Sequence, residues 1–188
     1  MRTVPSLVQS GAPTLPHAGS LGVIISLPAS LAAELGQKRA QFAGPSAAVV
    51  PPHITLVSGR ATDSWDAAVE HVREVAAEST PFKLSLRGTG TFQPVSPVVF
   101  LNVDHGAQEC AALHAKLVQG PLEHQLAFDF HPHLTIAHYL DDEIMDQAKE
   151  EMAHFEASFE VASIGLFDYI EGNWALREEL NLGGATRT

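Results

Sequence analysis

One five-residue pattern occurs twice in this chain of 188 residues, and it restricts the fold more than any other feature. Residues 52–56 read Pro-His-Ile-Thr-Leu, and residues 132–136 read Pro-His-Leu-Thr-Ile. Both copies alternate polar and aliphatic residues, which is typical of a half-buried strand. The two histidines are 80 positions apart. The pattern therefore predicts two strands in related environments within one fold.

The period of a strand predicts where these side chains point. Residues two apart in a strand lie on the same face, so His53 and Thr55 share one face, as do His133 and Thr135. The aliphatic neighbours pack behind them and hold each pair on a rigid core. If an internal twofold relates the two strands, both His-Thr pairs line a single cleft.

Two histidines facing one pocket suit phosphoryl chemistry. Their reference pKa near 6.5 allows one to be neutral and the other charged at neutral pH. The neutral imidazole can take a proton from water or a hydroxyl, and the charged one can give a proton to the leaving oxygen. Each threonine hydroxyl can donate a hydrogen bond to a phosphoryl oxygen. This chemistry requires no metal, and we expect no cofactor.

The rest of the chain mixes strands, hairpins and amphipathic helices, which favours an α+β fold with antiparallel or mixed sheets. We expect strands at residues 21–27, 47–57, 83–92, 98–103, 126–139, 159–169 and 173–177. We expect helices at residues 30–43 (capped by Ser30), 62–78, 107–119 and 141–155. No glycine-rich phosphate loop accompanies these elements.

Length and composition are those of a folded chain. With 188 residues, of which 45% are hydrophobic, the chain forms one domain or two small lobes that share a core. We expect a loose tail at residues 1–19, a single bilobal domain at residues 20–182 and a frayed end at residues 183–188. The single cysteine, Cys110, excludes an internal disulfide and a multi-cysteine zinc site.

The charge balance restricts the partners. A formal net charge of −11 does not favour long nucleic acid held by general phosphate attraction, although a local pocket can still bind a small or terminal phosphate. The longest apolar run, Leu21–Leu27, is too short to span a bilayer, and the first residues lack a secretory signal. We therefore expect a cytoplasmic protein with no membrane partner.

Paired His-x-Thr motifs about eighty residues apart, in a chain of under two hundred, resemble the 2H phosphoesterase superfamily. The resemblance is to its bacterial 2′-5′ RNA ligase and cyclic phosphodiesterase branch, and it covers roughly residues 20–180. The two motifs are specific, and the Gly-Thr-Phe segment at residues 90–92 supports them. The resemblance implies a bilobal α+β fold. In that fold, two lobes related by a pseudo-twofold, with their helices outside, face each other across a central cleft.

The resemblance also implies a substrate and residue roles. The substrate is a small nucleotide or an RNA terminus that carries a 2′,3′-cyclic phosphate or a 2′-5′ linkage, and hydrolysis of the cyclic phosphate leaves a 2′-phosphate. By analogy His133 is the base and His53 the acid, while Thr55 and Thr135 hold the phosphate. The acid and base roles reverse if the substrate binds in the opposite orientation, and ligation stays open because the same proton transfers run either way.

One position departs from the family pattern. Many relatives carry an arginine shortly after the second motif, where this chain has His138. A protonated His138 could take that role, but strict alternation puts it on the face opposite His133 unless a bulge turns it. The missing arginine and the acidic charge both favour a short, mononucleotide-like substrate.

Phe92 and His131 complete the predicted binding residues. Phe92 could stack on a base, although packing in the core is the commoner role of such a residue. His131 shares a face with His133 and is expected at the mouth of the pocket. We expect the other histidines to face solvent: His17, His71, His105, His114, His124 and His154.

Two alternatives remain open. The first is a nucleotide-binding module that keeps the cleft but has lost efficient catalysis. The second is a metal-dependent hydrolase that uses the cluster His131, His133 and His138, although no carboxylate falls at a convincing ligand spacing nearby. Turnover of cyclic nucleotides in the presence of a chelator supports the leading hypothesis. Nucleotide binding without turnover would favour the binding module, and activity that a chelator abolishes and zinc restores would favour the metal-dependent hydrolase.

Overall fold

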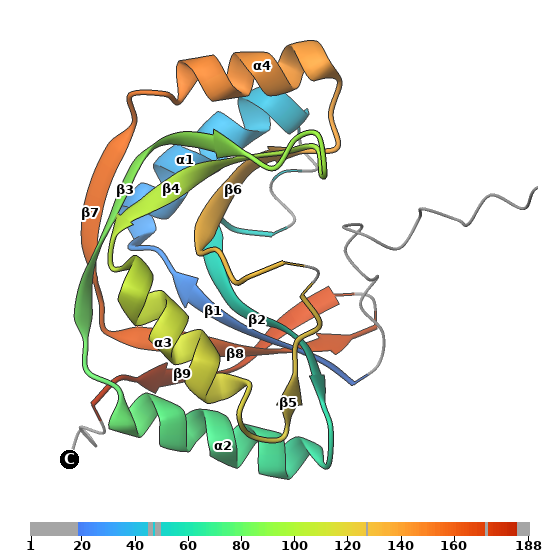
Figure 1. Ribbon diagram of the computed structural model, residues 1–188, viewed down its shortest axis with the longest axis vertical. Helices are drawn as coiled ribbons and strands as arrows, with labels where there is room; N and C mark the ends of the chain where they lie inside the picture. The colour runs from blue at the N-terminus through green and yellow to red at the C-terminus, as the bar shows by residue number, and fades with distance from the viewer. Residues whose placement is uncertain (1–18, 45–46, 48–49, 127, 172, 184–188) are drawn as a thin grey trace, which may run out of the picture.

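The computed structural model describes residues 19–44, 47, 50–126, 128–171 and 173–183 (Figure 1). Nearly all of the tail predicted at residues 1–19 therefore lies outside the described residues, and so does most of the frayed end predicted at residues 183–188. Between these limits the chain forms one curled, C-shaped layer of strands with helices packed against it (Figure 1).

The described residues form nine strands and four helices. The strands are β1 (Ser20–Ser26), β2 (His53–Ala61), β3 (Phe82–Thr91), β4 (Val98–His105), β5 (Leu122–Glu123), β6 (His133–His138), β7 (Glu156–Val161), β8 (Ser163–Ile170) and β9 (Asn173–Asn181). The helices are α1 (Ala29–Ala43), α2 (Trp65–Glu78), α3 (Ala107–Leu117) and α4 (Asp142–Glu151).

The strands form a single sheet whose centre is the pair β2 and β6. Its order is β7-β3-β4-β6-β2-β1-β8-β9, and β5 pairs with β2 beside this path. Every strand pairing in the described part is antiparallel. The predicted α+β class with antiparallel strands is thus confirmed. The two lobes are the two halves of one sheet, joined between β6 and β2.

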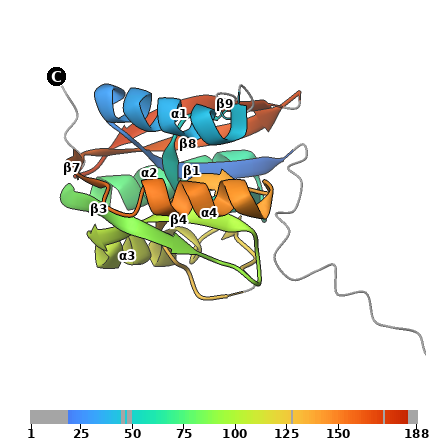
Figure 2. The ribbon, with the colours of Figure 1, turned by 90° about the horizontal axis from the view of Figure 1, so that it is seen from above.

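The two halves of the sheet contain an internal repeat. Apart from the two-residue strand β5, which lies between α3 and β6, the segments β1-α1-β2-α2 and β4-α3-β6-α4 have the same order of elements. In each repeat, the first helix crosses to the other lobe, so that α1 packs on β6 and α3 packs on β2. Figure 2 shows α1 and α4 side by side, consistent with the contact between them. Each half therefore depends on the other for its helical cover.

Prolines set the start of both central strands. The strand predicted from residue 47 begins only at His53, because Pro51 and Pro52 have no N–H to give to a sheet. Likewise, the strand predicted from residue 126 begins only at His133, directly after Pro132. Both motifs therefore place their histidine on the first residue of a strand.

Two further predictions need correction. The strand predicted at residues 159–169 is two strands that break at Ala162: β7 pairs with β3 in one lobe, and β8 pairs with β1 in the other. Ser30 does not cap α1, because Pro28 occupies the cap position and no side chain bonds there. By contrast, Ser64 caps α2 by accepting a hydrogen bond from the N–H of Ala67.

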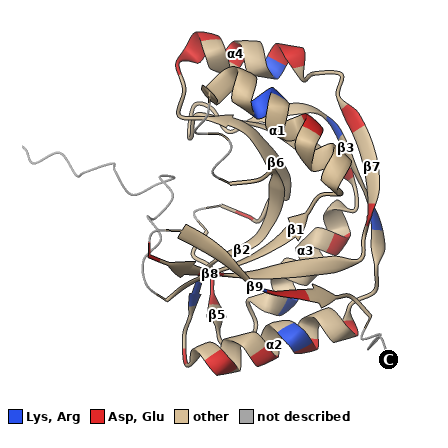
Figure 3. Cartoon of the chain, turned by 180° about the vertical axis from the view of Figure 1, so that it is seen from behind, with Lys and Arg blue, Asp and Glu red and all other residues tan. Residues whose placement is uncertain are grey.

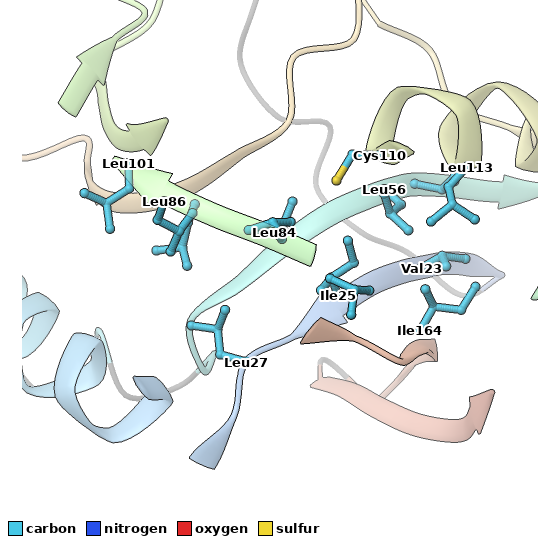
Figure 4. Close-up of a cluster of buried hydrophobic side chains, with 14 of the residues drawn as sticks. Val23, Ile25, Leu27, Leu56, Leu84, Leu86, Leu101, Cys110, Leu113 and Ile164 are labelled. Carbon is cyan, nitrogen blue, oxygen red and sulfur yellow. The ribbon is translucent and has the colours of Figure 1, made fainter. Parts of the chain in front are cut away.

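The core joins buried hydrophobic side chains of the strands to those of the helices (Figure 4). Ile25, Leu56 and Leu101 come from three different strands and are fully buried. Cys110 and Leu113 of α3 face the same cluster, as their helical spacing predicted. Since this face of each strand is apolar, the alternate residues of β2 and β6 lie on the opposite, inner face.

Charge is distributed unevenly over the molecule. Figure 3 shows acidic residues on the outer helices α2 and α4. Strands β1 and β6 carry no Asp, Glu, Lys or Arg. In the described part of the chain, no helix is long and apolar enough to cross a membrane.

Candidate active site

The two motif strands lie next to each other at the centre of the sheet. β2 and β6 are antiparallel, with Ile54 opposite Leu134. Continuing this register puts Thr135 opposite His53 and Thr55 opposite His133. The two histidines are then diagonal neighbours, and such positions lie roughly 7–8 Å apart. A local twofold through the Ile54–Leu134 pair thus relates the two motifs.

The two strands repeat each other in burial as well as in sequence. Residues 51–58 and 131–138 show the same order of exposed, half-buried and buried positions. Ile54 and Leu134 are fully buried, while the histidines and threonines beside them are half-buried. The core therefore fixes the backbone of each motif and presents its polar side chains on the inner face.

Each motif is followed by a β-bulge. The pairing of β2 with β1 skips Leu56, and the pairing of β6 with β4 skips Ile136, so an extra residue follows each motif threonine. Past the bulge, His138 pairs with Val98 and returns to the face of Thr135. The bulge therefore overrides strict alternation and brings His138 to the inner face. Ser58 takes the equivalent place in β2.

Backbone carbonyls hold both histidine rings in the same way. Nδ1 of His53 lies 2.8 Å from the carbonyl oxygen of Pro51, and Nδ1 of His133 lies 2.7 Å from that of His131. A carbonyl oxygen only accepts, so Nδ1 carries the proton in both rings. In the neutral state, Nε2 of each imidazole is then unprotonated and available as a base. In the charged state the same atom is a proton donor.

The surroundings lower the pKa of both histidines. Burial is the main cause for each ring. The positive charge of Arg39 lowers the pKa of His53 further, while the charges of His131 and His53 lower that of His133. Both imidazoles are therefore predominantly neutral at neutral pH in the free protein. Since the charge of His53 is among the causes that lower the pKa of His133, the two rings lie close enough to interact.

Among the described residues, aromatic rings contact the second motif histidine, His133, and not His53. The ring centroids of Phe92 and Phe100 lie 5.0 and 5.1 Å from that of His133, and the two phenyl rings are 4.4 Å apart. Gly90 makes room for this group, since a Cβ there would lie 2.6 Å from the ring of Phe100. Phe92 thus lies beside the motif rather than in the helix-covered core.

The six predicted site residues fall into two groups. His53, Thr55, His133 and Thr135 share the inner face of β2 and β6. Phe92 and His131 form the edge beside His133, with their ring centroids 5.8 Å apart. His131 is exposed, as expected for a residue at the mouth, and its backbone also holds the ring of His133.

Sequence reasoning missed residues that support the site from outside the motifs. Nδ1 of His114 in α3 bonds to the carbonyl of Leu56 at 2.7 Å, so it holds the first bulge, and its ring stacks on Phe130. Nε2 of His71 also bonds to the carbonyl of Leu117. The expectation that these histidines face solvent was therefore wrong for His71 and His114. It was also wrong for His124, whose burial lowers its pKa to about 4. The positions of His71 and His114 on helices gave no signal of these contacts.

Two further observations concern sites other than the motif histidines, namely a metal centre and a cavity. Among the residues that the structure describes, no group of three or more His, Cys, Asp or Glu is arranged to hold a metal ion. A cavity of about 370 Å³ lies between α2 and strands β8 and β9, where Trp65, Arg73 and Arg177 line it. It is on the helix side of the sheet, away from the motif residues.

The sequence and the fold both match a known family. Residues 27–173 match the family model of the 2′-5′ RNA ligase superfamily. The chain therefore belongs to the 2′-5′ RNA ligase superfamily, whose members are 2H phosphoesterases.

The curated relatives are named as phosphoesterases. A Bacillus licheniformis protein of that name is 29% identical over 145 residues, which cover 74% of this chain and 85% of the relative. A relative from Bacillus cytotoxicus is 26% identical over 173 residues, covering 89% and 99% of the two chains.

Solved structures share the fold. Escherichia coli LigT in complex with NADP⁺ superposes with a TM-score of 0.62 and 20% identity, covering 89% of this chain and 99% of LigT. A Thermus thermophilus protein superposes with a TM-score of 0.61 and 18% identity over 89% and 100% of the two chains. Both belong to the same α+β architecture as this chain.

Proposed function

We propose that this protein hydrolyses 2′,3′-cyclic phosphates or 2′-5′-linked nucleotide ends by acid–base catalysis with two histidines and without a metal. The observation that carries the proposal is the twofold arrangement of His53 and His133, each with Nδ1 fixed by a carbonyl and Nε2 available. Such a pair can act on opposite sides of one phosphorus atom. Membership of the 2′-5′ RNA ligase superfamily supports it.

The proposed step balances one proton taken against one proton given. Nε2 of His133 takes a proton from water as the water oxygen bonds to phosphorus. The bond from phosphorus to the ribose 3′-oxygen breaks, and protonated His53 gives that oxygen its proton, which leaves a 2′-phosphate. The hydroxyls of Thr55 and Thr135 donate hydrogen bonds to the non-bridging oxygens. Exchange with solvent then restores both rings.

A nucleotide ligand is consistent with a related structure. E. coli LigT has been crystallised with 3′-AMP, with ATP and with NADP⁺. In this chain, the half-buried ring of Phe92 beside His133 can contact a base by stacking. The net charge of −11 favours a mononucleotide or a short RNA end over long nucleic acid.

Product analysis tests the proposal. The protein is incubated with 2′,3′-cyclic AMP and with a 2′-5′-linked dinucleotide, with and without EDTA, and the products are separated by chromatography. We expect a 2′-phosphate, formed at the same rate in EDTA. His53→Ala and His133→Ala should each abolish most turnover, whereas the exposed control His154→Ala should not. Parental rates in both motif variants would overturn the proposal.

The other outcomes identify the alternatives. Loss of activity in EDTA with recovery on adding zinc would favour a metal-dependent hydrolase. Calorimetric binding of 2′-AMP without turnover of either substrate would favour a nucleotide-binding module.

A further inference from the structure

Arg39 differs from the other arginines of the described chain. Arg60, Arg73, Arg87 and Arg177 each have a carboxylate oxygen within 4.0 Å. The 22 Asp and Glu residues of the chain all lie in its described part, yet none of them pairs with Arg39. In a chain with twice as many acidic as basic residues, an arginine without a carboxylate is unexpected.

The position of Arg39 brings it to one end of the candidate site. It lies on α1, which packs against β6. Its Nη1 donates to the carbonyl of Val50 at 2.9 Å, and Val50 precedes Pro51, whose carbonyl holds the ring of His53. The guanidinium therefore contacts the segment that leads into the first motif.

Two histidines respond to the charge of Arg39. It lowers the pKa of His53 in β2 and that of His138 in β6, in each case in addition to the effect of burial. His138 is the residue that the second bulge turns onto the inner face. The guanidinium thus lies at the end of the two motif strands where His53 and His138 lie, close enough for its charge to act on both rings.

Burying the charged side chain of Arg39 costs free energy unless a ligand accepts hydrogen bonds from its N–H groups. Arg39 is partly buried, and desolvation lowers its pKa. A guanidinium has five N–H donors, and the described structure gives this one a single acceptor. A phosphate offers several anionic oxygens and matches the planar donors of arginine. A neighbouring carboxylate would compete with such a ligand.

We infer that Arg39 binds the phosphoryl group of the substrate and supplies the positive charge that the two motifs lack. This inference rests on the proposed function, since it assigns the anion of that same site. It also accounts for the departure after the second motif, where the family resemblance predicts an arginine and this chain carries His138. Because burial and Arg39 both lower the pKa of His138, the charge at neutral pH comes from α1 rather than from β6.

Phosphate binding tests the inference without relying on turnover. Inorganic phosphate is titrated into the protein and its variants by calorimetry at pH 7. Arg39→Gln keeps a polar N–H group but carries no charge, and should weaken binding about 10-fold or more, as expected for loss of a charge-assisted hydrogen bond. Arg39→Lys keeps the positive charge but lacks the planar donors of a guanidinium. Its affinity for phosphate should therefore lie between those of the parent and of Arg39→Gln. Arg73→Gln, whose partner Glu178 lies on the helix side, should bind like the parent.

The readouts separate a binding role from a structural one. The melting temperature without phosphate should change little in Arg39→Gln, while the stabilisation by added phosphate should be lost. Unchanged phosphate affinity in Arg39→Gln, or no binding of phosphate by the parent protein, would overturn the inference. If Arg39→Gln fails to fold, Arg39→Lys decides by the same comparison.

The test also distinguishes this inference from the proposed function. Phosphate binding that depends on Arg39, with no turnover of cyclic nucleotides, would refute the proposed function and keep the inference. Turnover with phosphate affinity unchanged in Arg39→Gln would refute the inference alone.

Discussion

The two motif strands have the same backbone framework but different surroundings. Both begin after a proline, both hold their histidine by the carbonyl two residues earlier, and both bulge after the threonine. The ring of His133 lies against Phe92 and Phe100, whereas His53 lies near the charge of Arg39. The repeated framework thus sets the geometry, and the unequal surroundings can give the two histidines different roles.

The largest expected effect distinguishes acid from base. His53→Ala and His133→Ala should each lower kcat/KM for 2′,3′-cyclic AMP by about 10²- to 10⁴-fold, the usual contribution of general acid–base catalysis. With a p-nitrophenyl phosphodiester, the leaving group needs no proton, so the loss in the acid variant should become much smaller. We expect this recovery in His53→Ala and not in His133→Ala.

Steady-state rates with the two substrates measure this difference. Recovery in His133→Ala instead would exchange the two roles while keeping the mechanism. His154→Ala serves as the control for removing a histidine.

Next in size is the effect of the threonines, which tests whether the symmetry extends to phosphate binding. Thr55→Val and Thr135→Val keep the β-branched shape but remove one hydrogen bond to a charged oxygen. Each should lower kcat/KM by about 10- to 100-fold. The two losses should be similar, because the twofold puts the hydroxyls in equivalent places. A loss in only one variant would show that a single strand holds the phosphate.

The pH dependence reports on both histidines together. Their pKa values lie below the usual range, so one ring is protonated only at pH values below about 6.5. We expect a bell-shaped kcat/KM profile that falls as pH rises through the lowered pKa of the acid. Bound phosphate favours the charged imidazole, so the descending limb of kcat should lie at higher pH. Profiles of both constants check this; a kcat/KM that is still rising at pH 8 would contradict it.

The smallest expected effect concerns the supports of the first bulge. His114→Ala removes the donor to the Leu56 carbonyl, and leaving such a group unpaired costs about 1–3 kcal/mol. We expect a lower urea midpoint with an unchanged slope, measured by circular dichroism. His154→Ala, an exposed residue, should leave the midpoint unchanged. An unaltered midpoint in His114→Ala would show that the bulge holds without this bond.

Much of the local structure could be predicted because it depends on neighbours in sequence. The helical spacing of Cys110, Leu113 and Leu117 predicted α3 and its inward face. The hairpin of β3 and β4 followed from strand patterns around a short turn. The break at Ala162 could not be predicted, because it depends on β7 and β8 pairing with strands far apart in the sheet.

The sequence by itself determined the repeated motif, the family and the face that each His-Thr pair occupies, since strand alternation is a local property. Only the tertiary structure decided that Ile54 meets Leu134, that a bulge turns His138 inward, and that Arg39 comes to the same end of the site. These depend on register and on the crossing of α1 to the other lobe. Packing between segments that are distant in sequence determines both the register and this crossing, so neither can be predicted from a local sequence pattern.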